Sequence, residues 1–92
     1  MKVILLDGNK ITSIRDLHEI FKESLDMPEW YGKNLDALHD LLTCYQDGVG
    51  IIAVNTPELS KTLGKRWHPF LRLMEDVCAA KDNIRFVMPF EN

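Results

Sequence analysis

The sequence of 92 residues has little of several features that mark other classes of protein. It holds only two cysteines, Cys44 and Cys78, which are too few for a disulfide framework and form no zinc-like cluster with histidines. No apolar run approaches the roughly 18 residues that a membrane-spanning helix needs. The apolar start of the chain ends at Asp7, which makes it too short for a signal peptide. We therefore expect a cytoplasmic protein with reduced thiols, no membrane association and no metal.

Glycine-rich motifs are also missing. Neither Gly8 nor the run Gly48-Val49-Gly50 has the spacing of a phosphate-binding loop or of a dinucleotide-binding fingerprint. The sequence therefore predicts that the protein uses no cofactor.

Positive charge is scarce in the first half of the chain. Residues 16–47 hold eight acidic residues against Lys22 and Lys33, a net charge of −6, whereas the whole chain carries −3. A region this acidic repels phosphates, which argues against nucleic acid as the direct partner. It favours a basic protein as the partner.

Hydrophobic periodicity divides the chain into three strands and about four helices. The strands are expected at residues 2–6, 49–54 and 84–88, and the helices at about residues 13–27, 34–45, 56–63 and 69–81. The first strand should be buried, the nearly all-apolar second strand should be central, and the third should lie at an edge. Helical connections make the strands pair in parallel. The expected fold is α/β, a three-stranded parallel sheet with about four helices packed on it, in one domain over residues 1–92.

Local signals set the ends of these helices. Ser13 is the predicted N-cap of the first helix, with Asp16 as its capping-box-like partner, and Asn34 is the predicted N-cap of the second. Thr56, followed by proline, should cap the third helix. Gly32 is free to take a positive φ in the turn before the second helix.

The most informative stretch is residues 28–42, P-E-W-Y-G-K-N-L-D-A-L-H-D-L-L. Its leucines recur at helical spacing and form one apolar stripe, whereas Asp36 and Asp40 lie one above the other on the opposite side. Trp30 and Tyr31 stand just before this acidic side, which is suited to a cationic partner. Taken alone, the pattern also fits ordinary solvated carboxylates near a helix N-terminus and half-buried loop aromatics.

This stretch resembles the signature of the barstar family, small intracellular inhibitors of ribonucleases. The most specific part is G-x-N-L-D-A-L-x-D, from Gly32 to Asp40, and the length and element order match along the whole chain. The resemblance implies a monomer that is not an enzyme and that occludes the active site of a basic ribonuclease of the barnase type. It also implies that Asp40 takes the place of a substrate phosphate, since a carboxylate accepts bidentate bonds from arginine in the same way.

The partner-binding residues that the resemblance implies are Trp30, Tyr31, Gly32, Asn34, Asp36, His39, Asp40, Tyr45 and Asp76. Three of them depart from the family pattern. Trp30 stands where tyrosine is usual, His39 where the best-known member has tryptophan, and Asp76 where glutamate is usual. His39 would gain charge below neutral pH, and Asp76 could instead form an i,i+4 ion pair with Arg72.

Two other functions fit the sequence. One is an acidic interaction module for a different basic partner. The other is a small hydrolase that uses Asp36 and Asp40 as an acid–base pair or as metal ligands. Helix-face carboxylates on so small a domain make no deep pocket, which favours binding over hydrolysis. The run Trp67-His68-Pro69 has no counterpart in the family pattern and is expected to be a helix-entry loop with a packing tryptophan.

Overall fold

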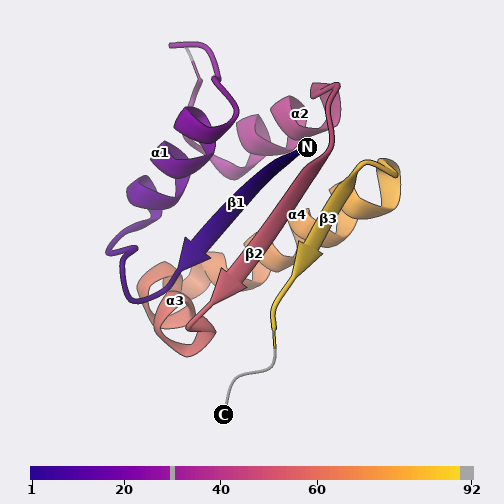
Figure 1. The fold of residues 1–92 in the computed structure, drawn as a ribbon. Helices are drawn as coiled ribbons and strands as arrows, with labels where there is room; N and C mark the ends of the chain where they lie inside the picture. The colour runs from indigo at the N-terminus through magenta and orange to yellow at the C-terminus, as the bar shows by residue number, and fades with distance from the viewer. Residues whose placement is uncertain (30, 90–92) are drawn as a thin grey trace.

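The computed structural model describes residues 1–29 and 31–89, in which three strands alternate with four α-helices and one short 3₁₀ helix (Figure 1). The elements are β1 (Lys2–Asp7), α1 (Ile14–Ser24), α2 (Leu35–Cys44), β2 (Val49–Val54), α3 (Thr56–Leu63), η1 (Gly64–Arg66), α4 (Trp67–Ala80) and β3 (Ile84–Val87). This order confirms the predicted α/β fold. None of the helices in these two ranges is long and apolar enough to cross a membrane.

The sheet is parallel throughout, and β2 lies between β1 and β3 as predicted. Ile51 of β2 pairs with Ile4 of β1 on one side and with Phe86 of β3 on the other. Alternate residues of β2, among them Val49 and Ile51, are buried against the helices. The hydrophobic core therefore lies on a single face of the sheet, between the strands and the helices.

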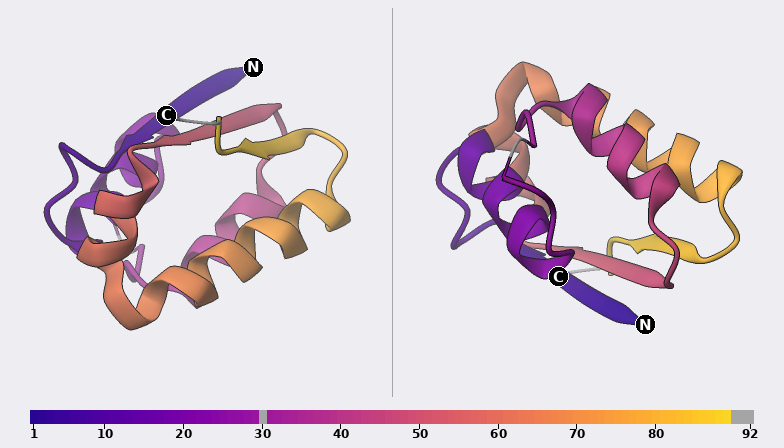
Figure 2. Two further views of the ribbon diagram at one scale, coloured as in Figure 1. Left: turned by 90° about the horizontal axis from the view of Figure 1, so that it is seen from below. Right: turned by 90° about the horizontal axis from the view of Figure 1, so that it is seen from above.

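All the helices of the described chain lie on that side of the sheet, and the opposite face is uncovered (Figure 2). The prediction of a buried first strand is accordingly wrong for half of its side chains. Ile4 and Leu6 are buried, whereas Val3 and Leu5 point the other way and are 65% and 53% exposed. Successive side chains of a strand point to opposite faces, and only one face here has helices to cover it.

The inner face of each long helix is apolar and supplies the rest of the core. Three helices, α1, α2 and α4, contribute the fully buried residues Leu17, Phe21, Leu38, Leu42, Phe70 and Val77. The 3.6-residue period of these positions explains why the polar residues between them, including Asp36 and Asp40, remain at the surface.

The predicted caps of α1 and α2 are confirmed, but two other helix starts differ. The hydroxyl of Ser13 accepts a hydrogen bond from the Asp16 backbone N–H at 3.1 Å. The N-cap of α3 is Asn55, in a left-handed conformation, so Thr56 is already inside that helix. The run Trp67-His68-Pro69 is not a loop as predicted. The helix η1 leads directly into α4, and Trp67 is the first residue of α4. Trp67 does pack, stacked against Phe70 with ring centroids 6.2 Å apart.

Candidate functional site

The N-terminus of α2 is fixed by its own side-chain cap. The Asn34 Oδ1 accepts a hydrogen bond from the Ala37 backbone N–H at 2.8 Å. The positive φ in this turn belongs to Lys33, at 51°, and not to Gly32, although glycine is free to adopt one. Asn34 follows directly with an extended backbone, which turns the chain into the helix.

Asp36 and Asp40 are both exposed on α2, as predicted. Leu38 and Leu42 on the opposite side of the helix are fully buried, which fixes the rotation of α2 and keeps the two carboxylates in solvent. The Asp40 side chain is 86% exposed, and the Nδ1 of half-exposed His39 lies 3.9 Å from its Oδ1.

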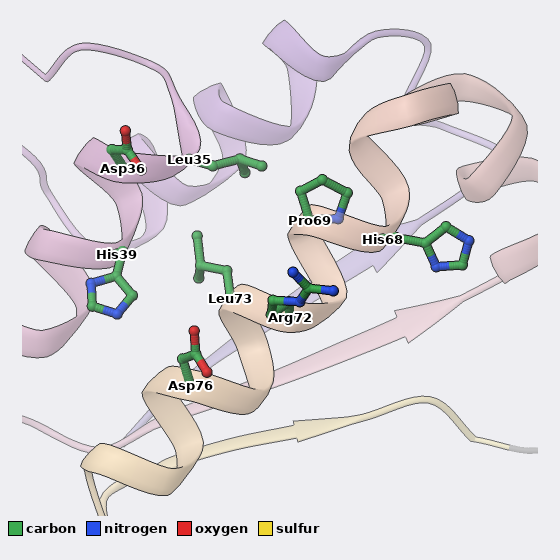
Figure 3. Close-up of a pocket in the computed structure, with 8 residues that line it drawn as sticks. All are labelled: Leu35, Asp36, His39, His68, Pro69, Arg72, Leu73 and Asp76. Carbon is green, nitrogen blue, oxygen red and sulfur yellow. The ribbon is translucent and has the colours of Figure 1, made fainter.

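A groove of about 280 Å³ runs between α2 and α4 beside Asp36 (Figure 3). Leu35 from α2 and Leu73 from α4 point into it, and Asp76 points toward it from the next turn of α4. The other residues that line it are Asp36, His39, His68, Pro69 and Arg72. The groove therefore brings Asp76 to the same surface as Asp36, although 40 residues separate them in the sequence.

The alternative expectation for Asp76, an ion pair with Arg72, is wrong. Within residues 1–29 and 31–89 the ion pairs are Lys22–Glu29 and Lys33–Glu19, and the His39 ring lies near the Asp40 carboxylate. Arg72 and Asp76 both line the groove without pairing, so each can interact with a bound partner.

The side chain of Tyr31 is not on this surface, which agrees with the alternative interpretation of a loop aromatic that packs against the core. It is only 4% exposed, and its hydroxyl lies 2.6 Å from the Nδ1 of His18 on α1. Burial lowers the pKa of His18, and the positive charges of Arg66 and Lys33 lower it further. Burial also raises the pKa of Tyr31 above its usual range. Burial therefore favours a hydrogen bond between a neutral imidazole and a protonated tyrosine hydroxyl.

His18 is the functional candidate that the sequence interpretation missed. It is the buried polar residue of the described core, at 1% exposure. The signal was available, because position 18 lies three residues before Phe21 and four after Ile14, on the apolar side of α1. A histidine at such a position needs a hydrogen-bond partner, and the partner comes from the loop that precedes α2.

Two ion pairs also connect α1 to this loop. The Lys33 ammonium pairs with Glu19, whose pKa it lowers, and the Lys22 ammonium lies 3.3 Å from the Glu29 carboxylate. Both lysines of the acidic half of the chain are thus engaged with glutamates of α1 and the loop. Asp36 and Asp40 keep their negative charge for other interactions.

Of the two remaining predicted residues, only Tyr45 belongs to the described chain, and it lies apart from the groove. Tyr45 caps the C-terminus of α2 and is partly buried against the core, beside a separate hollow of about 200 Å³ that Leu41 and Cys44 also line. Trp30 lies outside the described residues. The structure thus brings Gly32, Asn34, Asp36, His39, Asp40 and Asp76 to the surface formed by the loop, α2 and α4.

The buried His18 predicts a pH dependence of stability. Its pKa is lower in the folded than in the unfolded protein, so the unfolded state takes up more protons as the pH falls below about 6.5. The free energy of unfolding should be highest above that pH. It should decrease as the pH falls, by at most about 1.4 kcal/mol per pH unit for one proton. Urea unfolding between roughly pH 7.5 and 5.5 measures this loss, above the range in which carboxylates titrate. We expect His18→Asn to abolish the dependence and His39→Asn to preserve it; the opposite result would contradict the assignment.

Comparison with known proteins supports the resemblance along the whole chain. The family model described as Barstar (barnase inhibitor) matches residues 1–91. A protein of Bacillus subtilis (strain 168) named "Putative ribonuclease inhibitor YrdF" is 40% identical over 62 residues, which cover 67% of this chain and 68% of that protein. The family match includes all three strands, the α2 surface and Asp76 on α4, and is not confined to residues 32–40.

Proposed function

The chain belongs to the barstar family, and from that premise we propose that it inhibits a basic ribonuclease inside the cell by covering the active site of the enzyme. We call the surface that would contact the enzyme the acidic face. It consists of Asp36, His39 and Asp40 on α2, Asp76 on α4 and Gly32 in the loop before α2. The observation that carries the proposal is the pair of exposed carboxylates on α2, held outward by the buried leucines behind them.

The chemistry of this proposal follows from what a ribonuclease active site must contain. An enzyme that binds a phosphodiester has cationic side chains around the phosphate, and those same donors bind a carboxylate bidentately. Asp40 is the substitute for the phosphate that the resemblance implies, and its side chain is 86% exposed and therefore open to a partner. Asp36 on α2 and Asp76 on α4 line the same groove and would supply charge to cationic residues at the rim of the enzyme site.

The fold prepares this surface before binding. The Asn34 cap fixes the start of α2, and the His18–Tyr31 hydrogen bond and the Lys33–Glu19 ion pair hold the loop in front of it. Little conformational entropy is then lost when the partner binds, which favours affinity. In this proposal Tyr31 positions the loop and does not touch the enzyme.

The acidic half of the chain would also speed the encounter. A net charge of −6 over residues 16–47 attracts a basic enzyme from a distance, and this attraction falls as salt is added. His39 would oppose the attraction when it is protonated, because it lies beside Asp40.

A second candidate function keeps the same surface but changes the partner. Arg72 lines the groove next to Asp76 and adds a positive charge to a surface that would meet a cationic enzyme. A protein that is basic overall and also places a carboxylate opposite Arg72 would fit this pattern. The alternative partner is therefore a basic protein other than a ribonuclease. The hydrolase interpretation has less support, because the described residues that line the groove include no serine, threonine or cysteine nucleophile.

The direct test is to titrate basic ribonucleases from the same organism with the purified protein and to measure RNA cleavage. We expect activity to fall linearly with added protein and to reach its minimum at a ratio of one to one. A folded protein that inhibits none of them would favour the second candidate function. RNA or ester hydrolysis by the protein alone, lost in Asp40→Ala, would support the hydrolase instead.

A further inference from the structure

The uncovered face of the sheet gathers the large exposed apolar side chains of the described chain. Val3 and Leu5 of β1 and Val87 of β3 lie on it, and Met1 and Met88 lie at the ends of these strands. We call this surface the outer face. Parallel sheets are normally covered on both sides, and monomeric proteins rarely leave a contiguous apolar patch in water. The outer face therefore has the character of an interaction surface.

The strand register arranges the outer face in rows. Leu5, Ile52 and Val87 form one apolar row across the three strands. Val3, Gly50 and Arg85 form the row beside it, so that the single cation of these two rows stands at the β3 edge. Gly50 has no side chain of its own, and the Met1 Sδ lies 3.9 Å from the position that its Cβ would take, so apolar atoms of Met1 cover the middle of this row.

Opposite charge lies beyond the β1 edge. A groove of about 520 Å³ separates Leu5 from α1. Its charged lining consists of four acids, Asp7, Asp16, Glu19 and Glu23, and one cation, Lys10, so the groove is acidic on balance. Glu23 and Arg85 are both exposed, and neither belongs to an ion pair within residues 1–29 and 31–89. The outer face is thus apolar in the middle, basic at one lateral edge and acidic at the other.

We propose that this face binds a second copy of the same chain, related by a twofold axis parallel to the strands. Such an axis places β2 over β2 and β3 of each copy over β1 of the other. The row of Leu5, Ile52 and Val87 then meets itself in reverse order. Arg85 of each copy lies over Val3 of the other and can reach the acidic groove at Glu23. A twofold interface must be complementary to itself in this manner.

The proposed dimer is independent of ribonuclease binding. The acidic face on α2 and α4 lies on the other side of the sheet, so a dimer would leave both acidic faces open (Figure 2). Three short strands offer less area than a standard interface, and we therefore expect weak association with a dissociation constant in the micromolar range. This inference departs from the monomer that the sequence predicts.

Sedimentation equilibrium of the full chain from roughly 5 μM to 1 mM tests the proposal, because this range spans micromolar dissociation constants. We expect the apparent mass to rise from that of one chain to that of two. Leu5→Glu should weaken association at least about tenfold, because it buries a charge in the apolar row. Leu5 is half exposed, so the variant should keep its fold, which circular dichroism verifies. An unchanged monomer at the highest concentration would overturn the proposal and leave the face for a different protein or for solvent.

A charge swap tests the predicted geometry. Glu23→Arg alone and Arg85→Glu alone should each weaken the dimer several-fold, and the double variant should recover most of the loss. Asp36→Arg on the acidic face is the matched control and should leave the dimer unchanged. Association that is lost in Asp36→Arg but retained in Leu5→Glu would show that copies meet through another surface, and the proposal would be wrong.

Discussion

Replacing Asp40 by alanine should weaken ribonuclease binding by about 2–5 kcal/mol, or roughly 30-fold to several-thousand-fold in the dissociation constant. In the proposed complex the Asp40 carboxylate is surrounded by the cationic groups that normally hold a phosphate. Its removal leaves those groups desolvated and without a partner, which costs more than the loss of one hydrogen bond. The protein itself should lose little stability, since Asp40 is exposed on α2 and contributes nothing to the core.

A matched control is Asp47→Asn, which removes the same charge from an exposed position beyond the C-terminal end of α2. This variant should change mainly the association rate and its dependence on salt, because a rim charge acts through long-range attraction. Stopped-flow association and calorimetry on both variants separate the two effects. If Asp40→Ala binds its ribonuclease as tightly as the unaltered protein, Asp40 is not the phosphate substitute, and inhibition must rest on another part of the surface.

Much of the fold can be predicted because its signals are local. The order of strands and helices follows from hydrophobic period, and the ends of α1 and α2 follow from Ser13 and Asn34, whose side chains act within three residues of themselves. The exposure of Asp36 and Asp40 follows from the same period, since Leu38 and Leu42 had to be buried on the other side of α2.

The predictions that failed depend on which elements meet in three dimensions. The sequence allowed Tyr31 to be a half-buried loop aromatic but could not identify the residue that it contacts, because its hydrogen-bond partner His18 is 13 residues away on another helix. Val3 and Leu5 look as buried as their neighbours, and only the placement of every helix on one side of the sheet exposes them. In the loop, the left-handed conformation falls on Lys33 instead of Gly32, where the Lys33–Glu19 ion pair helps to hold it.

Gly8 shows the same difference between a local and a tertiary role. In the sequence it looks like a turn residue after the first strand, for which alanine would be a mild replacement. In the structure it is buried where the ends of β1 and β2 meet the start of α3, and its N–H donates to the Val54 carbonyl at 3.0 Å. A Cβ at this position would lie 2.1 Å from the Asn55 carbonyl oxygen and 2.7 Å from the Leu59 nitrogen.

Gly8→Ala should therefore destabilise the protein by about 3 kcal/mol, near the upper end of the usual cost of overpacking, because both neighbouring atoms belong to the backbone and cannot rotate away. For a domain of this size the melting temperature should fall by roughly 12–24 °C. Gly50→Ala is the control: its Cβ would come no closer than 3.9 Å to any neighbour, and its effect should stay within about 1 kcal/mol. Equal melting temperatures for the two variants would mean that α3 does not pack against Gly8 as described. A selective loss in Gly8→Ala would show that this glycine is required by close backbone packing and not by a turn.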